Sequence, residues 1–162
     1  GTAFLLEDTG FITCAHCVGE NLSIWHPTNP TKKYLINAIQ KDDDIDVAIL
    51  SVPAELSAVV SMKLSTIDVS GGAIPVRLFG YPNHEIWHPI RKENGEVIRT
   101  FPKSGVQYLE VTNKIIEGNS GGPVLDEKYN VLGIAAKGMN QDTGLKSAEF
   151  LAIAISELKK VK

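Results

Sequence analysis

Three side chains, far apart in the sequence, could together perform nucleophilic chemistry. His16 follows one apolar stretch, Asp46 opens another, and Ser120 lies in the glycine-rich turn of residues 117–124. A serine hydroxyl is a weak nucleophile until an adjacent base removes its proton, and the base in turn needs a group that orients it. The three segments therefore predict a nucleophile, a base and an acid, provided that the fold brings them together.

Each of these residues has a defined task in that chemistry. His16 can take the serine proton because an imidazole exchanges protons near neutral pH. Asp46 can fix the imidazole tautomer and stabilise the imidazolium, and Asp44 is the nearest alternative. The glycines around Ser120 reach backbone conformations closed to other residues, so the N–H groups of Gly118 and Ser120 can point at one spot and form an oxyanion hole.

Taken singly, each segment has an ordinary structural explanation. A glycine-rich turn is often only a loop, a histidine after a strand is often structural, and an aspartate at a strand start is usually a solvated cap. The joint occurrence, in the order histidine, aspartate, serine, is far more specific than any one of them.

The elements that must position these residues are short β-strands. The 14 Gly and 8 Pro divide the chain into apolar runs that are rich in branched residues, which is typical of an all-β sandwich or barrel. Turn signals such as Asn94-Gly95 and residues 142–144 separate the runs. The strands expected are residues 2–6, 11–14, 34–39, 47–52, 76–80, 108–111, 131–136 and 150–155.

Helical spacing appears only at the end of the chain. Ile155, Leu158 and Val161 recur every third position, and Ser156 could cap the segment. We therefore expect a C-terminal helix over residues 155–162. Residues 51–72 are the least patterned stretch and could connect two lobes.

Composition limits the class of protein. The 162 residues suit one domain, or two small lobes that share a cleft. With 16 Lys and Arg against 19 Asp and Glu, the net charge of −3 argues against a nucleic-acid partner. No apolar run approaches the ~18–20 residues that span a bilayer. The compartment stays unknown, although the lack of a visible signal peptide or disulfide framework favours the cytoplasm.

The three segments resemble sequence blocks of the trypsin-like serine peptidases, which have the chymotrypsin fold. Residues 13–18 resemble the family's Thr-Ala-Ala-His-Cys-Val block, with cysteine in place of the first alanine. Residues 46–50 and 118–123 resemble its Asp-x-Ala-x-Leu and Gly-Asp/Asn-Ser-Gly-Gly-Pro blocks. The resemblance implies two six-stranded antiparallel β-barrels, approximately residues 1–60 and 61–154. His16, Asp46 and Ser120 would meet in the cleft between them.

The departures from the family pattern point to one branch of it. Cys17 has no partner for the disulfide that many members form. Asn119 replaces the aspartate that pairs with a newly cut N-terminus in digestive members, and Gly1-Thr2 is not their usual start. These features, with Phe-Gly-Tyr-Pro at residues 79–82, resemble the HtrA-like, bacterial or organellar branch. A strand before Gly1 is also expected to be missing.

The resemblance also implies a substrate-binding set. Lys114 aligns with the base of the primary specificity pocket and Ile115 follows it, while Ala136, Lys137 and Gly138 look like a strand edge that pairs with an extended peptide. Lys114, with Lys137, could favour an acidic residue before the scissile bond, or its ammonium could simply reach solvent. Trypsin's preference for basic residues is disfavoured, and a small or apolar preference stays open.

These inferences predict a serine endopeptidase acting on a peptide or protein substrate. It would need no metal and no cofactor, and regulatory domains could be attached outside this chain. Cys14 and Cys17 are expected to be small apolar residues rather than zinc ligands, because a second ligand pair is lacking.

Two alternatives stay open. One is a trypsin-like fold used as a regulated or inactive binding module. The other is a zinc peptidase, because His84-Glu-Ile-Trp-His88 fits a zinc-binding pattern. That pattern requires a helix, and Pro89 directly after His88 argues against one.

Overall fold

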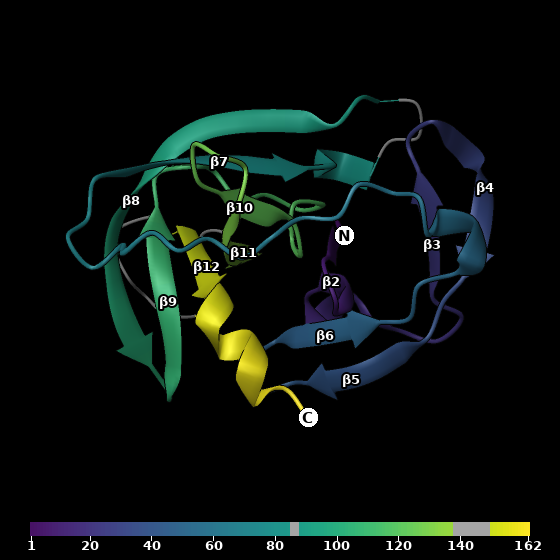
Figure 1. The fold of residues 1–162 in the computed structure, drawn as a ribbon, viewed down its shortest axis with the longest axis horizontal. Helices are drawn as coiled ribbons and strands as arrows, with labels where there is room; N and C mark the ends of the chain where they lie inside the picture. The colour runs from purple at the N-terminus through teal and green to yellow at the C-terminus, as the bar shows by residue number, and fades with distance from the viewer. Residues whose placement is uncertain (85–87, 138–149) are drawn as a thin grey trace.

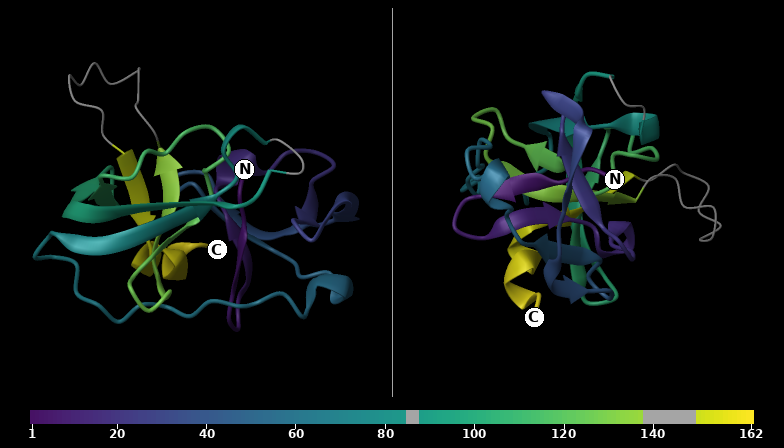
Figure 2. Two further views of the ribbon diagram at one scale, coloured as in Figure 1. Left: turned by 90° about the horizontal axis from the view of Figure 1, so that it is seen from above. Right: turned by 90° about the vertical axis from the view of Figure 1, so that its right-hand side faces the viewer.

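The computed structural model describes residues 1–84, 88–137 and 150–162. The N-terminal half is a four-stranded antiparallel sheet in the order β1-β2-β6-β5 and a separate β3–β4 hairpin. Figure 1 and Figure 2 place β1 and β2 between this hairpin and the rest of the molecule. The elements are β1 Phe4–Leu6, β2 Gly10–Thr13, η1 Ala15–Cys17, β3 Ser23–His26, β4 Asn29–Leu35, β5 Ala38–Asp42, β6 Val47–Leu50 and η2 Ala54–Leu56.

The C-terminal half is a closed antiparallel barrel of six strands. Its order is β10-β11-β12-β9-β8-β7, and it closes because β7 pairs with both β8 and β10. Closure leaves no unpaired strand edge around this half. Its elements are β7 Ile74–Gly80, η3 Pro82–His84, β8 Arg91–Lys103, β9 Val106–Val111, β10 Pro123–Leu125, β11 Val131–Lys137 and β12 Phe150–Ala154, and η5 Ile155–Lys160 follows it.

The predicted all-β class and a closed barrel are therefore confirmed, but only one barrel is closed. Among the described strands β1 pairs only with β2, and β3 only with β4, although Leu6 of β1 also forms a single bridge with Met62. The predicted first barrel is thus represented by an open sheet and a hairpin. A cavity of about 810 Å³ lies beside these open strands. Its walls include Leu5, Ile24, Trp25, Met62 and Tyr81, but not His16, Asp46 or Ser120.

Apolar side chains pack both inside each half and between the halves. One buried cluster joins β1, β2 and β6 to the barrel and includes Ile12, Val47, Leu125 and Ile153. A second cluster fills the barrel, and a third lies within the N-terminal half. The shared cluster fixes one half against the other, so residues from both can contribute to one site.

The unpatterned stretch around residues 51–72 runs along both halves. Met62 donates its N–H to Leu5 O at 2.8 Å and accepts from Glu7 N–H at 2.9 Å. Farther on, Ser65 N–H donates to Val131 O at 2.9 Å, and Val131 N–H donates to Lys63 O at 2.8 Å. This segment therefore connects β1 with the barrel strand β11.

The expected turn at Asn94-Gly95 is wrong. Both residues lie inside the long strand β8, where they pair with Arg77 and Val76 of β7. A Cβ on Gly95 would meet the side-chain amide of Asn113. The glycine therefore lets the Asn113 side chain pack closely against the strand. From the sequence alone, a glycine needed for close packing cannot be distinguished from a glycine needed for a turn. The other expected turn, at residues 142–144, lies outside the described residues.

The predicted C-terminal helix is a 3₁₀ helix over Ile155–Lys160. Its N-cap residue is Ala154, with no side-chain cap hydrogen bond, so Ser156 does not have the expected capping position. A 3₁₀ helix has three residues per turn. The three-residue spacing of Ile155, Leu158 and Val161 fits that period better than the 3.6 of an α-helix. No helix in the described part of the chain has the length and apolar character needed to cross a membrane.

Candidate active site

His16 stands in a tight turn at the end of β2. Cys17 N–H donates to Cys14 O at 3.0 Å and Val18 N–H donates to Ala15 O at 3.0 Å, which forms the short helix η1. Ala15 is buried and anchors the turn. The His16 side chain is 51% exposed, so its ring is held by the turn yet open to a substrate.

Asp46 is presented by a second tight turn, just before β6. Asp42 Oδ1 accepts N–H groups from Asp44 and Ile45, each at 3.0 Å, and Asp46 N–H donates to Asp42 O at 2.9 Å. Asp46 itself has a left-handed backbone with φ of 69°. Aspartate tolerates this conformation better than most residues, and non-glycine residues in it occur disproportionately at functional sites.

The structure brings His16 and Asp46 together through two hydrogen bonds. His16 N–H donates to Asp46 Oδ1 at 2.9 Å, and His16 Nδ1 lies 2.7 Å from Asp46 Oδ2. Because a carboxylate only accepts, Nδ1 carries the proton and Nε2 is left to accept one. Asp46 is the partner that the sequence favoured. The other candidate, Asp44, is exposed and uses its N–H to form the supporting turn.

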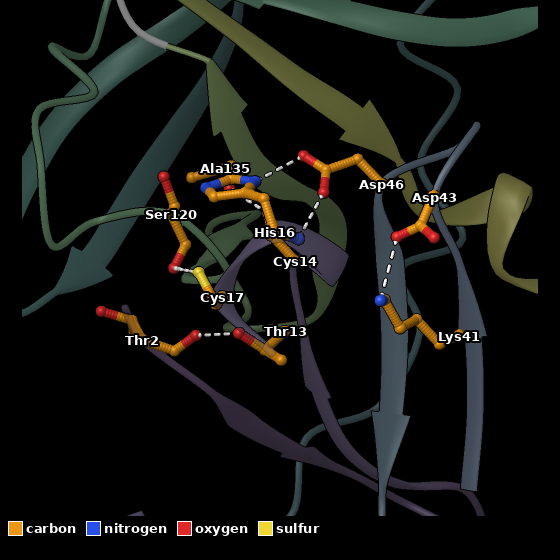
Figure 3. Close-up of polar contacts among 10 residues, drawn as sticks. All are labelled: Thr2, Thr13, Cys14, His16, Cys17, Lys41, Asp43, Asp46, Ser120 and Ala135. Atoms are coloured by element: carbon orange, nitrogen blue, oxygen red, sulfur yellow. Dashed lines mark hydrogen bonds and ion pairs between the residues drawn. The ribbon is translucent and has the colours of Figure 1, made fainter. Parts of the chain in front are cut away.

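Ser120 lies in a turn that is attached to β11. Gly121 N–H donates to Ala135 O at 2.7 Å, and Ala135 N–H donates to Gly122 O at 2.8 Å. In Figure 3 the His16 ring lies between the Asp46 carboxylate and the Ser120 side chain. No hydrogen bond joins the Ser120 hydroxyl to the imidazole, although both lie in the described part of the chain. Such bonds are often long in ligand-free enzymes and tighten when substrate binds.

The backbone before Ser120 offers two unused donors. Asn119 N–H is taken by Ile116 O at 3.0 Å. By contrast, the N–H groups of Gly118 and Ser120 donate to no protein group among the described residues. Gly118 has φ of 98°, and a Cβ there would run into Tyr81 O. The conformation that leaves this N–H available therefore requires glycine.

Thr2 links the beginning of the chain to this turn, and the sequence did not indicate it. Its N–H donates to Ser120 O at 2.8 Å. Its hydroxyl donates to Gly118 O at 2.6 Å and accepts Tyr81 N–H at 3.1 Å. Thr2 O accepts the Thr13 hydroxyl at 2.8 Å. A buried threonine at the start of an apolar strand carries no local signal of such contacts, since its partners are distant in the sequence.

The two cysteines flank the His16 turn as free thiols. Cys14 is fully buried, and its Sγ lies 3.2 Å from Ala135 O. Burial, with a smaller contribution from the Asp46 charge, raises the pKa of the Cys14 thiol well above its ordinary value. Cys17 is partly buried, which also raises its pKa, and its Sγ lies 3.7 Å from Ser120 O.

The predicted substrate-binding residues occupy different environments. Lys114 is exposed, and its N–H donates to Glu93 Oε1 at 3.1 Å, so an acidic group already lies nearby. Ile115 is buried in the barrel core, and Ala136 in the cluster shared by the halves. Lys137 ends the described part of β11. Gly138 lies outside the described residues, and the roles of all five stay predictions.

The zinc-peptidase alternative gains no support from the described residues. Pro82–His84 form a short turn in which Asn83 has φ of 64°, which is incompatible with a continuous helix. Residues 85–87 lie outside the described part. His88 is exposed and in no helix.

The fold is that of a trypsin-like peptidase domain. A family model described as "Trypsin-like peptidase domain" matches residues 1–134, and the chain belongs to this family. The chain is 27% identical over 156 residues to Protease Do-like 2, chloroplastic, of Arabidopsis thaliana. That match covers 83% of this chain and 23% of the relative. The chain spans less than a quarter of the curated relatives that it matches.

Solved structures of proteases share the fold. The active form of the Rv3671c protease from M. tuberculosis is 20% identical, with a TM-score of 0.81 over 99% of this chain and 70% of that one. The HtrA-type protease AlgW with decapeptide is 18% identical, with a TM-score of 0.78 over 96% of this chain and 48% of that one. The predicted resemblance to the HtrA-like branch is thus confirmed at the level of the fold.

Proposed function

We propose that this domain is a serine endopeptidase that hydrolyses peptide bonds through an acyl-enzyme on Ser120. The observation that carries the proposal is the two-point hydrogen bonding of His16 to Asp46, with the ring between that carboxylate and the Ser120 side chain. Membership of the trypsin-like peptidase family supports it.

The first half of the reaction forms the acyl-enzyme. Ser120 Oγ attacks the carbonyl carbon of the scissile bond while His16 Nε2 takes the hydroxyl proton. The Gly118 and Ser120 N–H groups donate to the oxygen that becomes negative, in a site where such donors stabilise the transition state. The imidazolium, held by Asp46, then gives its proton to the leaving amine and the C–N bond breaks.

The second half releases the other part of the substrate. Water attacks the ester carbonyl and His16 takes one of its protons. The tetrahedral intermediate then collapses, and Ser120 regains its proton from His16. The same donors and the same acid–base pair serve both halves, so no metal or cofactor enters the scheme.

Covalent labelling tests the proposal directly. We expect a fluorophosphonate probe to add once to the folded chain, as measured by intact mass. Labelling should be abolished in Ser120→Ala and unaffected by a chelator. A folded protein that does not react would instead favour the binding-module hypothesis. Peptide hydrolysis that persists in Ser120→Ala and stops with a chelator would favour the zinc-peptidase hypothesis.

A further inference from the structure

Three side chains of types that commonly bind metal ions lie close together at the candidate active site, and the candidate base His16 is one of them. Cys14 Sγ, a ring nitrogen of His16 and a carboxylate oxygen of Asp46 all lie within 4.8 Å of one another. They come from the end of β2, from η1 and from the turn before β6, and Figure 3 shows the His16 ring and the Asp46 carboxylate facing each other. This is the only such group of three donors in the part of the chain that the structure describes.

The set has the chemistry of a thiophilic cation site. Thiolate, imidazole and carboxylate are all ligands of Zn²⁺, with bond lengths of roughly 2.0–2.3 Å. Tetrahedral coordination at such lengths places ligand atoms roughly 3.3–3.8 Å apart. The three donor atoms, all within 4.8 Å of one another, are thus close to this spacing, but the 2.7 Å contact between His16 Nδ1 and Asp46 Oδ2 needs to open.

Little opposes this rearrangement. The Cys14 thiol has weak polar contacts, with Ala135 O at 3.2 Å and with the backbone of Gly121, and a thiol is a weak donor. The His16 side chain is half exposed whereas Cys14 is fully buried, so a cation would have to pass the His16 ring to reach Cys14 Sγ. The sequence argued against zinc here because Cys14 and Cys17 lack a second ligand pair. In the fold, the partners of Cys14 are His16 and Asp46.

We propose that Zn²⁺ or Cd²⁺ binds Cys14 Sγ, His16 Nδ1 and Asp46, and inhibits the domain reversibly. On binding, the Cys14 thiol loses its proton to solvent. The Nδ1 lone pair goes to the metal, so the proton of the neutral ring resides on Nε2. A ring protonated at Nε2 cannot accept the Ser120 proton. The inhibition rests on the proposed peptidase function, whereas the binding does not.

Binding is measured first, without reference to activity. Ser120→Ala protein is titrated with CdCl₂ in buffer free of thiol reductants, following the ultraviolet cadmium–thiolate charge-transfer band and the bound metal by equilibrium dialysis. We expect one bound Cd²⁺ per chain with a thiolate band. The band should disappear in Cys14→Ala and in Cys14→Ser, and persist in Cys17→Ser. Circular dichroism checks that each variant is folded.

Inhibition is measured second, as fluorophosphonate labelling with ZnCl₂ or CdCl₂, relative to each variant's own metal-free rate. We expect at least a tenfold loss of labelling in wild type and Cys17→Ser, reversal by EDTA, and no loss in Cys14→Ala. The proposal is overturned if no thiolate band forms, or if the band follows Cys17. It is also overturned if Cys14→Ala is inhibited like wild type.

The two proposals fail in different ways. A wild-type chain that is never labelled, even without metal, contradicts the peptidase function. If the cadmium–thiolate band then still depends on Cys14, the metal site stands without it.

Discussion

The two halves of the molecule hold their candidate residues by different means. In the C-terminal half, β7 pairs with β8 on one side and β10 on the other, so the barrel that carries the Ser120 turn has no open edge. In the N-terminal half, β1 and β3 each pair with only one other described strand, and β1 has one further bridge, from Leu6 to Met62. His16 follows β2 and Asp46 precedes β6, the two central strands, which pair with each other. Two local turns and the hydrogen bonds between the two residues then fix their side chains.

Contacts between the halves compensate for the open sheet. Thr2, Met62 and the buried cluster around Ile12 all join the N-terminal strands to the barrel. A site assembled in this way requires each half to be ordered and the two halves to keep their positions relative to each other. Substitutions in the turns should therefore change the reaction, whereas substitutions at the far end of the barrel should change only stability.

The largest effect is expected from Asp46→Asn. An asparagine side chain can donate to Nδ1 and so favours the wrong imidazole tautomer, and such a change costs roughly 10⁴ in kcat. Steady-state hydrolysis of a peptide substrate measures the loss. The control is Asp44→Asn in the same turn, which should stay near wild type. A severe loss in the control with near-normal Asp46→Asn would make Asp44 the orienting group.

Gly118→Ala should come next. The added Cβ would meet Tyr81 O and lies 2.8 Å from Asn83 N, in a backbone conformation that disfavours alanine. The Gly118 N–H should rotate away from the site, at a cost of roughly 10²–10³ in kcat. Gly71→Ala is the matched control, because a Cβ there meets nothing within 4 Å. Equal kcat values for the two variants would contradict the proposed role of the Gly118 N–H in the oxyanion hole.

Thr2→Val tests the contact between the halves. Valine has the shape of threonine but leaves the Gly118 carbonyl and the Tyr81 N–H without their hydroxyl partner, and an unsatisfied buried group costs about 1–3 kcal/mol. Since 1.36 kcal/mol corresponds to a tenfold change in rate, we expect kcat to fall roughly tenfold with KM little changed. Thr2→Ser keeps the hydroxyl and should restore kcat. A purely structural role would instead lower the thermal stability of Thr2→Val and leave its kcat unchanged.

The sequence could single out candidate residues because the chemistry itself restricts their types. His16 and Asp46 lie next to strands that the apolar pattern of the sequence predicts. In the structure two hydrogen bonds join the two residues. Thr2 was missed because its partners are Gly118 and Tyr81, and only the tertiary fold brings them near. Their roles in a reaction stay predictions until the variants are measured.

The errors have local causes. The Asn94-Gly95 pair has strong turn propensity, but its glycine serves a close approach by the Asn113 side chain inside β8. The three-residue spacing of Ile155, Leu158 and Val161 indicates a helix without specifying its type, and the structure shows a 3₁₀ helix there. Barrel closure depends on which strands meet, and apolar runs carry no information on that point.

The smallest effect is expected from Glu157→Gln, in the 3₁₀ helix η5 that follows the barrel. Glu157 Oε1 accepts Gln107 N–H at 3.0 Å, and Oε2 lies 2.8 Å from Lys160 Nζ. Burial alone would raise the pKa of Glu157, but the Lys160 and Gln107 hydrogen bonds lower it overall. A carboxyl whose pKa is lowered by folding stabilises the protein above its ordinary value of 4.5. That stability is lost as pH falls through the lower folded-state pKa.

Because Lys160 is half exposed, this ion pair contributes no more than about 1 kcal/mol. Urea unfolding should therefore show wild type slightly more stable than Glu157→Gln at pH 7, with the difference vanishing well below pH 4.5. The kcat should be the same for both proteins at pH 7. A difference in stability that persists at low pH would assign the effect to packing rather than charge. A loss of kcat would show that the end of the barrel is coupled to the site, and the division of tasks between the two halves would not hold.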